Sequence, residues 1–341
     1  MFILKNRQTE SKDSSMKEIG GFFELELDRK VELYQDATAK VNSGRNAINY
    51  VLQASGARKV YVPYFTCGTV IEPMITLGIE YVFYALNENL EISDDIVDDL
   101  KENEKLIYIN YFGIKNRYVD TLAAELGDKL IIDNTQAFFK KPIENTNSCY
   151  SPRKFFGVAD GGYVYMQGKL DQTLEQEKSY DRCQALLGRS ENKASDVYSL
   201  YAQHNKEMCN RPLKSMSTLT HKILSSIDYE KIKLIRERNF LYLHAHLKED
   251  NLLQIDGANV IGPMVYPLWI KTEGLRDHLI KEKIYVPTYW SEVLDYVENQ
   301  EQVEASFVKF LLPIPIDQRY EISDMDRVVQ VVKKFINDIE M

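Results

Sequence analysis

Two side chains with catalytic potential stand about twenty residues apart in this chain. Asp133 ends the apolar run L-I-I and opens D-N-T-Q, and Lys154 lies in the aromatic, glycine-bounded loop S-P-R-K-F-F-G. A lysine amine that is desolvated, or placed beside a cation such as Arg153, attacks carbonyl groups to form Schiff bases. A carboxylate that faces a pyridine nitrogen keeps it protonated, and Gln136 follows at a spacing that suits a ring hydroxyl. The pattern predicts a pyridoxal 5′-phosphate (PLP) site, with Lys154 as the catalytic amine and Asp133 and Gln136 as ring partners.

A phosphate site is expected at the start of a predicted helix. Ser43-Gly44-Arg45 precedes apolar residues at helical spacing, and the backbone N–H groups and dipole of a helix N-terminus attract anions. Gly44 permits close approach, and the side chains of Ser43 and Arg45 can add contacts. Ser151, three residues before Lys154, is a second candidate. Taken singly, each of these residues also fits a surface turn or a helix cap.

The elements that would position these residues alternate between helix and strand from 43 to 139. This alternation favours a mainly parallel sheet covered by helices, with Asp133 at the carboxyl end of a central strand, where α/β proteins bind ligands. Residues 168–250 have a helical pattern, and the remainder fits a smaller α+β domain. We expect a large domain over 1–240, including the N-terminal segment 1–40, and a small one over 241–341.

Composition excludes several classes of function. The 42 basic and 51 acidic side chains give a net charge of −9, which argues against a nucleic-acid partner. The apolar stretches are too short for a membrane span, so no membrane partner is expected. The four cysteines form no C-x-x-C pair, which fits reduced thiols and a cytoplasmic location. The five histidines have no metal-ligand spacing, so no metal is expected.

The order of the motifs resembles the DegT/StrS family of PLP-dependent sugar aminotransferases. The motifs are S-G-R-N-A-I, V-P-Y-F-T-C, Y-F-G, D-N-T-Q-A-F and S-P-R-K-F-F-G-V-A-D-G-G, within residues 40–165. The resemblance implies the type I PLP aminotransferase fold: an α/β large domain with a mainly parallel sheet flanked by helices, and a smaller C-terminal α+β domain. It also assigns Gly44 and Arg45 to the family's phosphate-binding Gly-Thr.

Several positions depart from the family pattern. Arg45 replaces a threonine, and Cys67 stands where an aromatic residue usually stacks on the cofactor, with Tyr64 or Phe65 as possible substitutes. Cys149 replaces a serine, so Ser151 would take over its phosphate contact. The later Asn-x-Arg segment, which reaches the phosphate of the partner subunit in the family, is not evident. These departures affect substrate identity more than PLP binding.

The resemblance implies transfer of an amino group from an amino acid, glutamate first, to a nucleotide-linked keto-sugar, in surface polysaccharide or secondary-metabolite biosynthesis. It also implies a homodimer. Two alternatives stay open: another PLP-dependent enzyme on the same fold, such as a lyase or aldolase, and a non-catalytic homologue that acts as a binding protein. Conversion of the cofactor to its amine form by a donor would distinguish the first alternative, and failure to bind PLP would favour the second.

Overall fold

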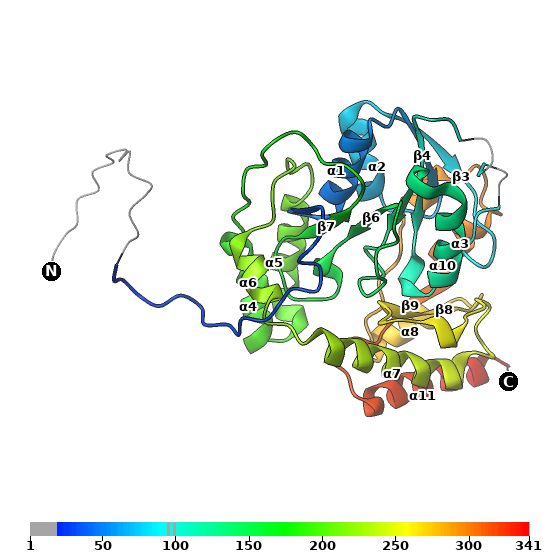
Figure 1. Ribbon diagram of the computed structural model, residues 1–341. Helices are drawn as coiled ribbons and strands as arrows, with labels where there is room; N and C mark the ends of the chain where they lie inside the picture. Colours follow the sequence, from blue (N-terminus) through cyan, green and yellow to red (C-terminus); the bar gives the residue numbers. More distant parts are fainter. Residues whose placement is uncertain (1–18, 94–95, 98–99, 341) are drawn as a thin grey trace.

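The computed structural model describes residues 19–93, 96–97 and 100–340 and centres on a seven-stranded sheet (Figure 1). The strand order is β1-β7-β6-β5-β4-β2-β3, in which β3, β2, β4, β5 and β6 pair in parallel and β7 pairs antiparallel with both of its neighbours, β1 and β6. The strands are β1 (Ala39–Val41), β2 (Lys59–Pro63), β3 (Glu80–Tyr84), β4 (Glu104–Ile109), β5 (Leu130–Asp133), β6 (Asn147–Tyr150) and β7 (Gly162–Tyr165). The predicted mainly parallel sheet is confirmed, and β5 lies at its middle.

Helices cover both faces of this sheet. Ile131 of β5 packs in one apolar cluster with α1 (Gly44–Ser55) and α2 (Gly68–Leu77), whereas Ile132 packs in another with α3 (Asn116–Leu126). Because neighbouring strand residues point to opposite faces, one strand contributes to both cores. This burial on both sides explains the continuous apolar run that precedes Asp133.

Local signals set the ends of the first helices. The Ser43 side chain accepts a hydrogen bond from the Asn46 amide and caps α1, which ends at Gly56 with a φ of 63°. Gly78, with a φ of 66°, ends α2. Glycine adopts this left-handed conformation without the steric cost that a Cβ imposes. The predicted helix start at Ser43 is confirmed.

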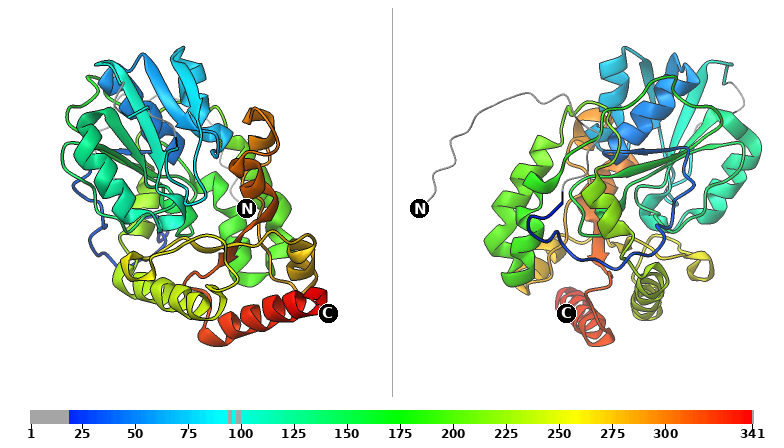
Figure 2. Two further views of the ribbon diagram at one scale, coloured as in Figure 1. Left: turned by 90° about the vertical axis from the view of Figure 1, so that its right-hand side faces the viewer. Right: turned by 60° about the vertical axis from the view of Figure 1, so that its left-hand side comes forward.

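The C-terminal half is largely helical. It contains α4 (Gln184–Glu191), α5 (Ala194–Glu207), α6 (Thr218–Leu224), α7 (Tyr229–Leu247), α8 (Leu275–Lys281), α9 (Val293–Tyr296), α10 (Val303–Phe310) and α11 (Ile322–Glu340). An antiparallel pair, β8 (Val265–Trp269) and β9 (Leu311–Pro315), is the second sheet. Helices α7 and α11 lie side by side beneath it (Figures 1 and 2). The domain division at 240/241 stays a prediction, and α7 runs across it.

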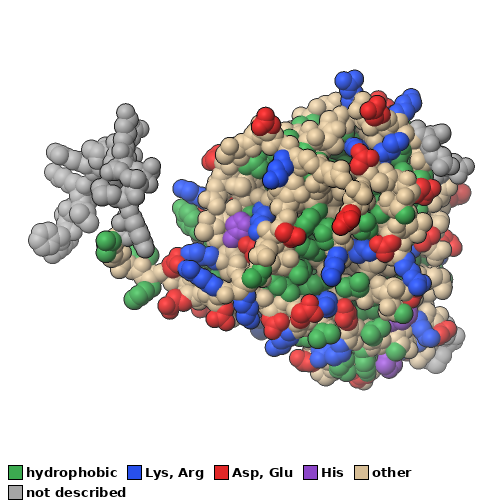
Figure 3. Space-filling model, in the orientation of Figure 1, with side chains coloured by type: hydrophobic (Ala, Val, Ile, Leu, Met, Phe, Trp, Pro, Cys, Tyr) green, Lys and Arg blue, Asp and Glu red, His purple; other side chains and the backbone are tan. Residues whose placement is uncertain are grey.

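Acidic and basic side chains alternate over the face shown in Figure 3, with apolar groups scattered between them. No single sign of charge dominates this face. Within the part of the chain that the structure describes, no helix has the length and apolarity needed to cross a membrane.

Two adjacent glycines fix the start of α1 against β7. A Cβ at Gly162 would lie 2.3 Å from the Ser43 carbonyl oxygen, and one at Gly161 would lie 2.8 Å from the Pro152 Cγ. Both contacts are far shorter than van der Waals distance. The Gly-Gly pair therefore lets the helix start and the lysine loop approach the same strand.

We expect Gly162→Ala to lower the free energy of unfolding by about 2–3 kcal/mol, because the new methyl group displaces the Ser43 carbonyl. Urea unfolding followed by circular dichroism measures the change. Gly157→Ala is the matched control, since a Cβ at Gly157 has no atom within 4 Å, and it should change stability by less than about 0.5 kcal/mol. Equal stabilities for the two variants would contradict this packing.

Candidate active site

Asp133 is a buried carboxylate at the carboxyl end of the central strand β5. Only 3% of it is exposed, and its Oδ1 accepts a hydrogen bond of 2.8 Å from the Thr135 amide. Among the described residues, no lysine, arginine or histidine forms an ion pair with it. Burying an uncompensated charge is costly. Asp133 is therefore well suited to a cationic ligand atom such as a protonated ring nitrogen.

Cys149 lies beside Asp133 on the neighbouring strand β6, where the two residues are register partners. The thiol is fully buried. Burial raises the pKa of the Cys149 thiol well above its ordinary value, and the negative charge of Asp133 adds to the shift. A protonated thiol at this position adds no second negative charge next to the carboxylate.

Lys154 contacts the loop that follows Asp133 in the chain. It ends a short turn, Pro152–Lys154, that follows β6, and its Nζ donates to the Thr135 Oγ1 at 2.9 Å. Thr135 thus contacts both residues, the lysine through its hydroxyl and the carboxylate through its amide. Lys154 itself is exposed, because the neighbouring Phe155 side chain is buried in the aromatic core and does not cover it. Phe155 therefore does not supply the desolvation of the lysine amine that the aromatic loop suggests.

The N-terminus of α1 adjoins this group of residues. A Cβ at Gly44 would lie 3.0 Å from both the Ser151 Cβ and the Thr135 Cγ2, so the absence of a side chain leaves room there. Ser43 binds the Asn46 amide through its hydroxyl and the Ala47 amide through its carbonyl. The first N–H groups of a helix have no intrahelical partner, which leaves those of positions 44 and 45 for an anion.

The Arg45 side chain points elsewhere. Its Nε lies 2.9 Å from the Glu72 Oε2, and its Nη1 donates to the Met208 carbonyl at 2.6 Å. The guanidinium therefore joins α1 to α2 and to the end of α5. Only the backbone of Arg45 remains available for the predicted phosphate contact.

Gln136 is buried, and its Oε1 accepts from the Phe112 amide at 3.0 Å. Its amide nitrogen remains as the group that can donate to a ring hydroxyl. Of the two aromatic substitutes, Tyr64 stacks on Phe83 and Phe65 is buried against Trp290. Both rings are thus engaged in packing.

Cys67 is the N-cap residue of α2 and is partly exposed, with its Sγ 2.7 Å from the Thr69 Oγ1. Tyr289 lies near it: burial raises the pKa of Tyr289 to about 12, and the charges of Tyr201 and Cys67 contribute. Arg319 forms a two-point ion pair with Asp317, at 2.7 and 2.8 Å.

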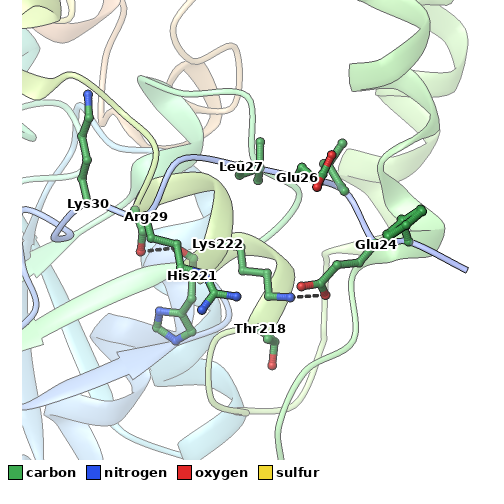
Figure 4. A pocket seen from close by; sticks show the side chains of 11 residues that line it. Glu24, Glu26, Leu27, Arg29, Lys30, Thr218, His221 and Lys222 are labelled. Carbon is green, nitrogen blue, oxygen red and sulfur yellow. Dashed lines mark hydrogen bonds and ion pairs between the residues drawn. The ribbon is translucent and has the colours of Figure 1, made fainter. Parts of the chain in front are cut away.

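A separate cavity of about 670 Å³ lies between α6 and an N-terminal arm, residues 23–30. Glu24 of the arm and Lys222 of α6 form an ion pair across it, and Arg29, Lys30, Thr218 and His221 also line it (Figure 4). None of the residues predicted from the sequence lines this cavity. Its mixed charges make it a poor candidate for a single anionic or cationic ligand.

Thr135 is the residue that sequence reasoning missed. The sequence pattern assigns roles to Asp133 and Gln136 on either side of it and none to Thr135 itself. The available signal was a hydroxyl side chain between two expected ring partners. The structure brings Asp133, Thr135, Lys154, Gly44 and Ser151 together, whereas Cys67 and the Arg45 side chain have other neighbours.

No known protein-family profile and no curated protein matches this sequence. Solved structures with similar architecture do match. AtS13 from Actinomadura melliaura has a TM-score of 0.62 at 12% identity, covering 87% of this chain and 86% of that one. A DegT/DnrJ/EryC1/StrS aminotransferase from Brucella abortus has a TM-score of 0.58 at 17% identity, covering 89% and 87%. The putative sugar aminotransferase Spr1654 from Streptococcus pneumoniae, in its PLP form, has a TM-score of 0.58 at 12% identity, covering 89% of each chain. The chain therefore has the fold of these solved structures, as the sequence predicts.

Cysteine alkylation tests the buried Asp133–Cys149 pair. We expect iodoacetamide at about pH 8.5 to modify exposed Cys209 at least roughly a hundredfold faster than Cys149, whose raised pKa and burial keep it protonated and inaccessible. Mass spectrometry of the alkylated peptides gives both rates. Asp133→Asn should leave Cys149 unreactive, because burial is the larger cause of its shift. Comparable alkylation rates for Cys149 and Cys209 in the folded protein would contradict the burial of Cys149 beside Asp133.

Proposed function

We propose that this chain is a PLP-dependent aminotransferase. The observation that carries the proposal is the convergence of an unpaired buried carboxylate, a lysine amine and a helix N-terminus around Thr135. These are the three contacts that PLP requires: one for its ring nitrogen, one for its aldehyde and one for its phosphate. The fold shared with solved sugar aminotransferases supports the same conclusion.

Bound PLP supplies an aldehyde that condenses with amines and a protonated ring that withdraws electrons. In this chain Asp133 would hold the ring-nitrogen proton, and the Gln136 amide would orient the ring hydroxyl. The backbone N–H groups of Gly44 and Arg45, with the Ser151 hydroxyl, would bind the phosphate. Lys154 would move a proton at its Nζ as general base and then as general acid.

Thr135 is well placed to assist Lys154. Its Oγ1 accepts from the Lys154 Nζ at 2.9 Å, and it is buried, with 6% exposed. A fixed hydroxyl limits the directions that the flexible lysine side chain samples. The amine is thereby held at Thr135, whose amide donates to Asp133.

The resemblance and the names of the similar structures support a substrate assignment. The donor is an amino acid, glutamate first, and the acceptor is a nucleotide-linked keto-sugar, in surface polysaccharide or secondary-metabolite biosynthesis. CalS13 and Spr1654 are named as sugar aminotransferases, and Helicobacter pylori PseC is named as acting in the biosynthesis of pseudoaminic acid. A donor screen in which another amino acid acts and glutamate does not would change the donor assignment.

The protein is further proposed to be a cytoplasmic homodimer. The four cysteines are free thiols, as expected in a reducing compartment, and the family resemblance implies two chains per active site. Sedimentation equilibrium of the PLP-loaded protein measures the assembly. A monomeric mass in an active preparation would reject the dimer.

PLP capture at Lys154 is the first test. We expect purified protein mixed with PLP to develop a visible absorption band that borohydride converts to a covalent adduct on the peptide containing Lys154. Lys154→Ala should lose the band and the adduct, whereas Lys178→Ala, a lysine outside the site, should keep both. Peptide mass spectrometry locates the adduct. No band in the wild-type protein would favour the binding-protein alternative.

The Asp133 charge is the second test. We expect glutamate to convert the bound cofactor to its amine form in the wild-type protein, with loss of the visible band. Asp133→Asn keeps the shape but removes the charge that holds the ring proton, so the conversion should slow by roughly a hundredfold or more. Stopped-flow absorbance gives both rates. Retention of the wild-type rate in Asp133→Asn would remove Asp133 from the proposed role.

A further inference from the structure

Arg236 of α7 is a buried guanidinium that contacts the loop carrying Lys154. Only 2% of it is exposed. Its Nη2 donates to the Phe155 carbonyl at 3.4 Å, and its guanidinium carbon lies 4.6 Å from the centre of the Phe155 ring. A cation over an aromatic face is attracted by the ring quadrupole. Arg236 therefore binds both the backbone and the side chain of the residue that follows Lys154.

The hydrogen-bond partners of this guanidinium are all neutral. Besides Phe155, it donates to the carbonyls of Pro263 and Met264, each at 3.2 Å, and to the Gln318 Oε1 at 3.1 Å. Burial lowers the pKa of Arg236 to about 10, with the Asp317 charge acting in the opposite direction. It thus stays charged at neutral pH. A buried arginine without a directly bonded carboxylate costs stability.

Gln318 supplies a second donor to the same carbonyl. Its Nε2 donates to the Phe155 oxygen at 2.8 Å while its Oε1 accepts from Arg236. At the other end of the lysine turn, the Pro152 carbonyl accepts from the Phe155 amide at 3.0 Å. Both backbone groups of Phe155 are therefore hydrogen-bonded. Its amide is bonded within the loop, and its carbonyl is bonded to the C-terminal half of the chain.

The contacts of Arg236 also reach Gln136. The Met264 carbonyl accepts from Arg236, and the Met264 amide donates to the Phe112 carbonyl at 2.9 Å. The Phe112 amide in turn donates to the Gln136 side chain at 3.0 Å. One guanidinium is thus linked through backbone groups to two predicted cofactor residues on separate loops.

We propose that Arg236, supported by Gln318, is a positioning residue that sets the direction of Lys154 toward the cofactor. The assignment rests on the proposed PLP function, which it deepens by identifying how the C-terminal half of the chain orders the lysine loop. Arg236 touches no reacting atom. It acts through the Phe155 carbonyl, and its loss should affect capture by Lys154 more than binding of the rest of the cofactor.

Two cofactor forms separate positioning from a general structural effect. Pyridoxamine 5′-phosphate lacks the aldehyde, so its affinity reports the ring and phosphate contacts without any bond to Lys154. We expect Arg236→Met to slow borohydride-trapped capture of PLP by about tenfold, and Gln318→Met by about threefold, as the loss of buried hydrogen bonds predicts. The affinity for pyridoxamine 5′-phosphate should stay within about twofold of wild type, well below the change expected for a lost hydrogen bond.

Hydrogen exchange of the cofactor-free protein gives an independent measurement. The peptide spanning 150–160 should exchange faster in Arg236→Met and Gln318→Met than in wild type. Arg238→Met is the matched control: Arg238 lies on the same helix but donates to Asn239 and to the Tyr320 carbonyl. It should change neither exchange of 150–160 nor PLP capture. If Arg236→Met does not fold, Gln318→Met carries the test.

The outcomes separate the two levels of the proposal. Wild-type protein that binds neither PLP nor pyridoxamine 5′-phosphate would reject the proposed function itself. Normal PLP capture in both variants would reject only the positioning role. An equal loss of capture and of pyridoxamine 5′-phosphate affinity would also reject it, because Arg236 would then support the whole site and not the lysine.

Discussion

The site depends on a carboxylate that the protein buries without giving it a cationic partner among the described residues. Asp133 occupies the carboxyl end of the middle strand, between two apolar layers that exclude water. Among the described residues, its carboxylate accepts a hydrogen bond from the Thr135 amide alone, so a large part of its desolvation cost is uncompensated. A ligand that brings a positive charge to this position recovers that cost. The central strand thus provides a driving force for binding as well as a position.

The phosphate side of the site depends on close backbone approach. Gly44 lies against Thr135 and Ser151 at distances that a side chain would fill, and Gly162 allows the Ser43 carbonyl to lie directly on β7. The helix start, whose first N–H groups have no intrahelical partner, thus adjoins Thr135, the residue that accepts a hydrogen bond from Lys154. The anion site and the amine are therefore parts of one packing arrangement, and both depend on glycine.

Much of this arrangement could be predicted from local sequence. The cap at Ser43, the stop at Gly78 and the strand ending at Asp133 are each determined by neighbouring residues, and helix–strand alternation places Asp133 at a ligand-binding edge. The role of Thr135 could not be predicted in this way, because a strand-end threonine gives no sign of which side chain it will meet. Arg236 lies 82 residues beyond Lys154, and its contact with Phe155 arises only from tertiary packing. The direction of the Arg45 side chain depends on Glu72 and Met208 for the same reason.

Two departures from the family pattern, Cys149 and Arg45, lie where the fold accommodates the new side chain. Cys149 packs in the apolar cluster beneath α1, and Ser151 lies next to Gly44 at the start of that helix. Arg45 turns its side chain toward Glu72 and keeps its amide at the helix start. Backbone donors do not depend on side-chain identity, so these two substitutions leave the main anion-binding groups in place. Cys67 is not compensated in this way, because stacking on a cofactor ring needs an aromatic face that no backbone group can supply.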